Sequence, residues 1–132
     1  MRQIYGLGRV RREISRHALA ELGSQGFTAL AIVHREGPIR ISEVAQGLAV
    51  DISVASRQIA ALAEAGYVTR ERDATDGRAQ VVATTDPGHR VLVESHRRMV
   101  AAFAEVLGDW SEADLAALTQ RLQRLNDSFS SP

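Results

Sequence analysis

Two short helices followed by a hairpin constrain the fold of this 132-residue chain more than any other feature of its sequence. Apolar residues recur at helical spacing over residues 42–48 and again over 53–65, with a break between them and Gly66 at the end. Residues 68–84 then alternate in strand fashion on both sides of the turn dipeptide Asp76-Gly77. This order predicts a helix-turn-helix followed by a two-stranded wing.

The helix boundaries in this central segment are predicted from capping and turn residues. Ser42 is expected to be the N-cap of the first short helix, and Gly47 together with residues 49–52 is expected to break it. An earlier helix over 27–35 should end at Gly37-Pro38, because proline disfavours helical geometry in the residue before it.

Amphipathic helices are predicted on both sides of the central segment. Residues 4–22 carry apolar positions at steps of three and four, and Gly23 is the expected stop. Thr85 is expected to cap a long helix, and Ser111 with Asp114 should form a capping box at the start of a last helix. That last helix carries an apolar seam with heptad spacing, which predicts a partner surface: Leu115, Leu118, Leu122, Leu125 and Phe129.

The second helix of the pair has a composition that suits contact with DNA. Periodicity predicts an inner face of Ile52, Ala55, Ile59 and Leu62 and an outer face of Val54, Arg57, Gln58 and Ala61. No acidic residue occurs from position 52 to 63, so nothing in this stretch repels phosphate. The alternative interpretation is an ordinary solvated helix face.

Individual roles on this helix follow from side-chain chemistry. We expect Gln58 to pair with an adenine edge and Val54 to contact a thymine methyl group. The phosphate backbone should be held by small hydroxyl side chains and a guanidinium group: Ser53, Ser56 and Arg57, with Ser42 from the preceding helix as a further DNA contact.

Arg78 follows the predicted hairpin turn, so its guanidinium group can reach the negative potential of a narrow minor groove. Asp73 and Asp76 are expected to support the wing, and Asp76 could fix Arg78 by a bidentate hydrogen bond. Alternatively, these aspartates only stabilise the turn, since Asp is common in hairpins of every function.

Composition and charge limit the classes of protein that fit. Hydrophobic residues make up 45% and charged residues 24%, which is typical of a globular domain. No apolar run reaches the roughly 20 residues of a spanning helix, and the N-terminal stretch lacks the apolar centre of a signal peptide, so we expect a cytoplasmic protein without membrane contact. The formal net charge is zero, so DNA affinity must depend on where single arginines lie.

Neither catalysis nor a metal site is expected. The chain has no cysteine, and it carries no Ser-His-Asp set, HExxH, Walker loop or GxGxxG motif. His89 and His96 would lie about 10 Å apart on a helix, too far to share an ion, and His34 is interpreted as a capping or core-edge residue. We therefore predict no enzyme, no cofactor and no bound metal.

Five sequence blocks, in order and spacing, resemble the MarR family of winged helix-turn-helix transcription regulators. They begin after Gly37-Pro38 and comprise Ser42-Glu43-Val44-Ala45, Ser56-Arg57, residues 62–68, residues 73–78 and Thr85 to Gly88. Two positions depart from that family's pattern: Thr84 stands where the family often has leucine, and Gly77 loosens the wing tip.

The resemblance implies a single, mainly α domain over residues 1–132, with a winged helix-turn-helix over 27–85 and dimerisation helices over 1–24 and 86–130. It implies a homodimer whose recognition helices enter successive major grooves of a pseudo-palindromic operator in double-stranded DNA. It further implies a repressor that responds to a small-molecule effector. The residues alone leave open an interaction module that has this fold but acts through protein or ligand contacts.

Overall fold

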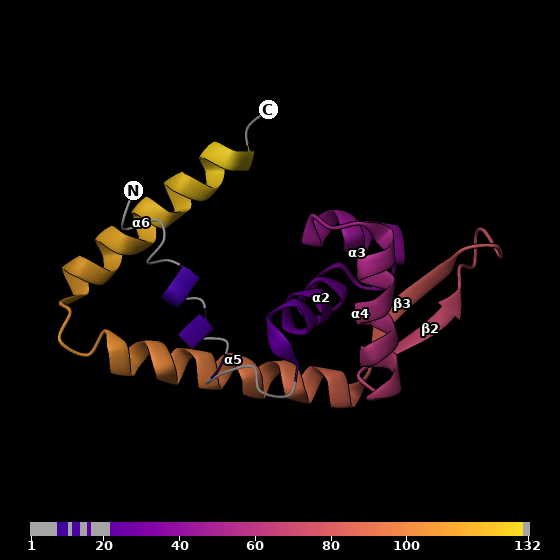
Figure 1. The fold of residues 1–132 in the computed structure, drawn as a ribbon, viewed down its shortest axis with the longest axis horizontal. Helices are drawn as coiled ribbons and strands as arrows, with labels where there is room; N and C mark the ends of the chain where they lie inside the picture. The colour runs from indigo at the N-terminus through magenta and orange to yellow at the C-terminus, as the bar shows by residue number, and fades with distance from the viewer. Residues whose placement is uncertain (1–7, 11, 14–15, 17–21, 131–132) are drawn as a thin grey trace. The chain divides into compact units, whose positions relative to one another are not determined.

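A computed structural model describes residues 8–10, 12–13, 16 and 22–130, and most of these residues are helical (Figure 1). The chain divides into two compact units, residues 1–102 and 103–132. The predicted helix over 4–22 falls largely outside the described residues, although 8–10, 12–13 and 16 are helical. The elements after it are α2 (Gly23–Glu36), β1 (Ile39–Arg40), α3 (Ile41–Leu48), α4 (Ile52–Glu64), β2 (Val68–Arg72), β3 (Gln80–Thr84), α5 (Asp86–Val106) and α6 (Glu112–Ser130).

The core of the first unit lies between α2, α3, α4 and the sheet. Its largest fully buried side chains come from all four of these parts: Leu30, Val33, Val44, Ile59 and Val82. Burying one such side chain stabilises the fold by about 1.5–3 kcal/mol relative to leaving it in water. The helix pair and the hairpin therefore share one hydrophobic core.

Gly47 has a different role from the one that the sequence predicted. Gly47 was predicted to help break α3, but it lies inside that helix. A Cβ atom there would approach Cδ1 of Ile32 to 2.9 Å, so glycine serves to let α3 pack closely against α2. Gly23, expected as the stop after residue 22, has a φ of 66° and is also the first residue of α2; the end of the preceding helix lies outside the described residues.

The start of α3 also differs from the prediction. Ser42 is the second residue of the helix and not its N-cap, because the backbone turns into the helix at Arg40. Glu43 accepts a hydrogen bond from the Arg40 backbone N–H at 2.8 Å, which satisfies a donor that the helix cannot. Ser42 is left exposed on the first turn.

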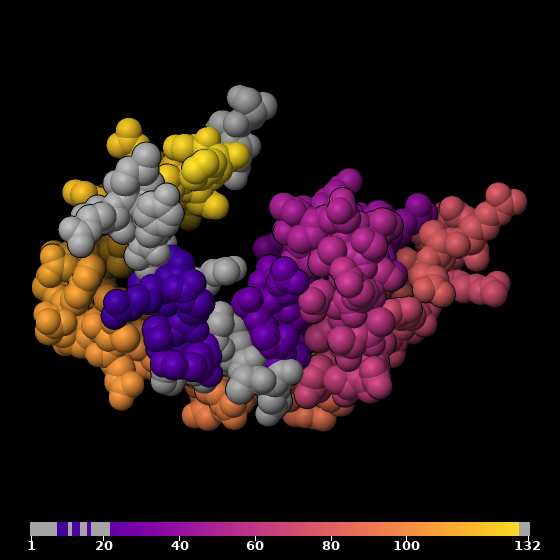
Figure 2. Space-filling view, viewed as in Figure 1, coloured from indigo at the N-terminus to yellow at the C-terminus, as the bar shows by residue number. Residues whose placement is uncertain are grey.

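The sheet has three strands where the sequence predicted two. Strand β1 pairs antiparallel with β3, with Ile39 opposite Val82, so the strand order is β1-β3-β2. Strands β2 and β3 pair from Val68–Thr84 to Arg72–Gln80, and the hairpin that they form projects from the helices of this unit (Figure 2). A two-residue strand after Gly-Pro is too short to produce a recognisable alternation.

The hairpin joins α5 through a close backbone contact. The Thr85 hydroxyl accepts from the Gly88 N–H at 3.1 Å, which confirms Thr85 as the N-cap of α5, and donates to the Gly66 carbonyl at 2.6 Å. A Cβ atom at Gly88 would lie 2.0 Å from the Tyr67 carbonyl oxygen. Only glycine fits where the first turn of α5 passes the Tyr67 backbone. This close contact explains the spacing of the Thr85-to-Gly88 block.

In the second unit, α6 begins at the predicted capping box. The Ser111 N–H donates to the Asp114 carboxylate at 3.1 Å, and the Asp114 N–H donates back to the Ser111 hydroxyl at 3.1 Å. The hydrogen bonds from Ser111 lower the pKa of Asp114. The seam of this helix is open to solvent toward its C-terminal end, where Leu122, Leu125 and Phe129 are exposed.

Candidate nucleic-acid interface

The exposed face of α4 is centred on Arg57. Ala55, Ile59 and Leu62 are buried as predicted, whereas Ile52 was predicted to face inward and is 58% exposed. The reason is its position as the first residue of the helix, where no neighbouring element covers it. The most accessible positions around Arg57 are Ser53, Ala60, Ala61 and Glu64.

Val54, Ser56 and Gln58 lie at the edges of this face and are half-buried. The Gln58 amide donates to the side-chain oxygen of Gln25 on α2 at 3.1 Å. Gln58 therefore has a partner within the protein, and a base contact would use the remaining amide hydrogen and the carbonyl oxygen. Gln25 had no recognisable role in the sequence, since nothing in the local pattern links positions 33 residues apart.

The loop end of the wing, where β2 leads into the turn, is held by a cluster that we call the wing brace: Arg40, Asp73 and Thr75. The Arg40 Nε and Nη2 atoms donate to Asp73 Oδ2 at 3.0 and 2.7 Å. The Thr75 backbone N–H and hydroxyl both donate to Asp73 Oδ1 at 2.9 Å. The brace thus connects the start of α3 to the end of β2.

The wing brace perturbs the ionisation of its members. Hydrogen bonds from the Thr75 backbone, the Arg40 guanidinium group and the Thr75 hydroxyl lower the pKa of Asp73 to about 2. Asp73 in turn raises the pKa of Arg40, chiefly through the hydrogen bond that it accepts from the guanidinium group. Asp73 is 14% exposed at its side chain, so the carboxylate is well shielded for a wing residue. Its predicted role in supporting the wing has this geometric basis.

Asp76 and Arg78 are arranged differently from the prediction. Asp76 Oδ1 accepts from the backbone N–H of Arg78 at 3.1 Å and does not hold the guanidinium group. The Ala79 N–H donates to the Asp76 carbonyl at 2.9 Å, so Asp76 opens the turn and Gly77 lies inside it without a positive φ. The turn therefore holds the Arg78 backbone in place, and the Arg78 side chain is exposed to solvent.

Sequence reasoning missed Arg40, which is the residue that joins the helix pair to the wing. Two local signals could have indicated it: the alternation of Ile39, Arg40 and Ile41, and Glu43 three residues later as a partial capping box. The exposed arginines of β2, Arg70 and Arg72, also escaped the site prediction.

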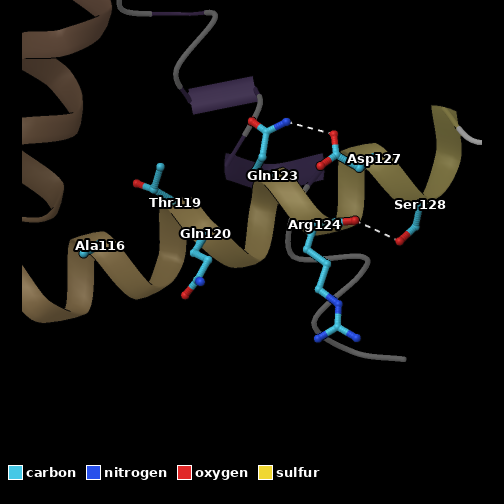
Figure 3. Close-up of a pocket in the computed structure, with 7 residues that line it drawn as sticks. All are labelled: Ala116, Thr119, Gln120, Gln123, Arg124, Asp127 and Ser128. Atoms are coloured by element: carbon cyan, nitrogen blue, oxygen red, sulfur yellow. Dashed lines mark hydrogen bonds between the residues drawn. The ribbon is translucent and has the colours of Figure 1, made fainter.

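Two shallow hollows are formed by described residues. One shallow hollow is lined by Ala45, Gln46, Ala49, Val50, Asp51 and Val54, at the turn between α3 and α4. A second lies along the polar side of α6, where Gln123 donates to Asp127 at 2.9 Å and the Ser128 hydroxyl donates to the Arg124 carbonyl at 2.8 Å (Figure 3). All of its described lining residues belong to α6.

Nowhere in residues 22–130 or the short described stretches before them do three or more His, Cys, Asp or Glu side chains gather as a metal site. No described helix combines the length and apolarity that crossing a bilayer requires.

Comparison with known proteins assigns the family. The profile of the MarR family matches residues 22–79, which include the helix pair and most of the wing. YxaD of Bacillus subtilis (strain 168), named as an uncharacterized HTH-type transcriptional regulator, is 32% identical over 93 residues. The chain belongs to the MarR family. The match to YxaD covers 70% of this chain and 65% of YxaD.

Solved structures of MarR proteins confirm the fold. A MarR family protein from Bacillus stearothermophilus superimposes with a TM-score of 0.85 at 17% identity and covers 98% of this chain and 92% of that one. The PcaV transcriptional regulator from Streptomyces coelicolor, solved with its natural ligand, gives 0.76 at 20% identity over 95% and 89% of the two chains. The family and its relatives are transcriptional regulators, in agreement with the prediction that this MarR chain is no enzyme.

Proposed function

We propose that this MarR chain is a sequence-specific DNA-binding transcription regulator that acts in the cytoplasm as a homodimer. The outer face of α4 is the observation that carries the proposal. Arg57 is exposed at its centre, small side chains surround it, and the first acidic residue comes only at Glu64, in the last turn. Such a face can enter a major groove without repelling phosphate.

The proposed contacts are of two kinds: some position the protein on the DNA backbone, and others read the base sequence. Ser42, Ser53, Ser56 and Arg57 hold the phosphate backbone, and Val54 and Gln58 read base edges from the border of the face. Arg78, exposed at the wing turn, enters the minor groove. Asp73 and Asp76 support the wing without touching DNA, since Asp73 is engaged by Arg40 and Asp76 by the Arg78 backbone.

The proposed homodimer is supported by the exposed apolar residues of the C-terminal unit. Leu122 and Leu125 are 49% and 48% exposed, and Phe129 is 84% exposed, on one seam of α6. Large contiguous apolar surface is rare on a monomer and marks an interface. A two-fold dimer would present two α4 helices to a pseudo-palindromic operator, about 34 Å apart, which is one turn of the duplex.

Repression with release by a small-molecule effector is the proposed mode of regulation. Membership of the MarR family supports it, and the PcaV structure was solved with a natural ligand. A ligand can release DNA only if it binds the DNA-free conformation more tightly than the DNA-bound one. Thermal-shift screening of the purified protein, followed by gel-shift titration with each hit, tests this: an effector must lower DNA affinity, and stabilisation without loss of affinity argues against it.

The central experiment is selection from random double-stranded oligonucleotides, followed by titration of the selected site at two salt concentrations. Arg57→Ala should weaken binding to all sequences and reduce the dependence of log K on log salt by about 1, because one phosphate contact is lost. Arg35→Ala is the matched control, since Arg35 is an exposed arginine at the end of α2 and pairs with Glu36. Its affinity and salt dependence should equal those of the wild type.

Gln58→Ala should instead relax the sequence preference at one base pair by about 1–3 kcal/mol. Gln25→Ala controls for the hydrogen bond between the two amides, because it removes the internal partner and keeps Gln58. If the wild-type protein selects no sequence and binds no DNA at low salt, DNA binding is refuted and the interaction module is favoured.

A further inference from the structure

Two histidines that are 55 positions apart in the sequence come together in the first unit. His34 lies in the last turn of α2 and His89 near the start of α5, with ring centroids 4.8 Å apart and ring planes inclined by 34°. Both residues are exposed. Neither ring has a hydrogen-bond partner among the described residues, so ring nitrogens on both are available to a ligand from solvent.

The backbone under each ring is firmly held. His34 follows the fully buried Val33, and the His89 N–H donates to the Thr85 carbonyl at 2.9 Å in the first turn of α5. That turn is tied to the hairpin because the Thr85 hydroxyl donates to the Gly66 carbonyl. The spacing of the rings is therefore set by the fold, and a ligand that bridges them has little backbone to order.

Imidazole is the preferred ligand of a limited set of ions. Zn²⁺, Cu²⁺ and Ni²⁺ bind neutral imidazole nitrogen, whereas Mg²⁺ and Ca²⁺ prefer oxygen. Two side chains on separate helices can bind one ion by small changes of their side-chain torsions, with water completing the coordination. The neighbouring Arg35 adds little repulsion, because its guanidinium Nε donates to Glu36 at 2.8 Å.

We propose that His34 and His89 form a two-histidine site for a late first-row divalent cation of the Zn²⁺, Cu²⁺ and Ni²⁺ class. A bound ion would link the end of α2 to the start of α5, the helix that carries the chain out of the winged helix-turn-helix. Sequence spacing could not indicate the site, since only His89 and His96 stand close together in the chain. The site is independent of the proposed DNA binding.

The test is a titration of the full chain with ZnCl₂, followed by carbon–proton NMR of the four imidazole rings. The signals of His34 and His89 should shift together, and MgCl₂ should shift neither. His34→Gln and His89→Gln should each weaken Zn²⁺ binding by more than about tenfold, since even the loss of a partner outside the ligand shell costs roughly 10- to 100-fold. Zn²⁺ should raise the melting temperature of the wild type but not of these variants.

His96→Gln is the matched control, because His96 is an exposed histidine on the same helix, about 10 Å from His89. It should keep wild-type affinity for Zn²⁺. The proposal is overturned if Zn²⁺ shifts no imidazole signal, if the shifted signals belong to His17 or His96, or if either single variant at positions 34 and 89 binds as tightly as the wild type. The ring contact would then be stacking alone.

Discussion

The winged helix-turn-helix and the C-terminal helix bury their apolar residues to very different extents. In the first, Leu30, Val33 and Ile59 are fully buried among residues of three helices and the sheet. In the second, Leu122, Leu125 and Phe129 of α6 are exposed. Both segments have regular apolar spacing in the sequence, so periodicity alone does not reveal whether the partner surface lies within the same chain.

This difference in burial separates stability that comes from contacts within one chain from stability that comes from association of two chains. The helix pair and hairpin have a core of their own, and their folding depends on contacts within the chain. Leu122, Leu125 and Phe129 of the α6 seam are exposed to water, so in the proposed dimer their burial depends on a second molecule and hence on protein concentration. Substitutions in the two regions should therefore differ in their dependence on concentration.

The largest effect is expected in the core of the first unit. Ile59→Ala should lower the free energy of unfolding by about 2–5 kcal/mol, because a fully buried side chain is replaced by a cavity. Ile52→Ala is a control with the same residue type on the same helix, and it should change stability by less than about 0.5 kcal/mol because Ile52 is 58% exposed. Urea unfolding followed by circular dichroism measures both, and equal losses would contradict the burial described for α4.

A second prediction concerns the seam of α6. Leu122→Glu combined with Leu125→Glu should convert the proposed dimer into monomers, because charges at an apolar interface are costly to bury. Light scattering coupled to size-exclusion chromatography should show half the mass, and operator affinity should fall by at least about tenfold once the two half-sites are no longer linked.

The matched control adds the same two charges to the polar side of α6. Gln120→Glu combined with Ser128→Glu introduces carboxylates along the hollow of Figure 3, four residues on either side of Arg124. This variant should remain dimeric. A wild-type protein that is monomeric at micromolar concentration would remove the basis of the comparison between the two regions.

Local patterns in the sequence were sufficient for much of the fold. The caps at Thr85 and Ser111 and the buried face of Ala55, Ile59 and Leu62 depend on residues within a few positions of each other, and the structure confirms them. The errors fall where a distant segment decides the outcome. Gly47 lies inside α3 where the end of the Ile32 side chain approaches it, and β1 exists because β3 supplies its hydrogen-bond partners.

The candidate site shows the same limit. The exposure of Arg57 and Arg78 followed from helical and hairpin periodicity. Arg40 and Gln25 were missed because their partners, Asp73 and Gln58, are each 33 residues away. The expected bond between Asp76 and the Arg78 guanidinium group was wrong because the turn places the Arg78 backbone N–H nearer to the carboxylate.

A smaller effect is expected at Thr84, at the end of β3. Its hydroxyl oxygen is buried and has no hydrogen-bond partner among the described residues. Thr84→Val should therefore stabilise the protein by about 1 kcal/mol, since an unpaired buried polar group is replaced by a methyl group. Thr69→Val on the exposed side of β2 is the control and should stay within about 0.5 kcal/mol of wild type. Destabilisation by Thr84→Val in urea unfolding would show that the hydroxyl has a partner.

The smallest expected effect lies in the wing brace and depends on pH. The pKa of Asp73 is lowered from 3.8 to about 2 by the Thr75 and Arg40 hydrogen bonds, so the ionised carboxylate contributes stability above pH 3.8 that is lost as the pH falls toward about 2. Asp73→Asn should be less stable than the wild type at neutral pH, and this difference should shrink through that window. Glu71→Gln, an exposed change on β2, controls for the loss of one charge. A difference between Asp73→Asn and wild type that persists unchanged at pH 2 would mean that packing at the loop end of the wing, and not the ion pair with Arg40, is what Asp73 provides.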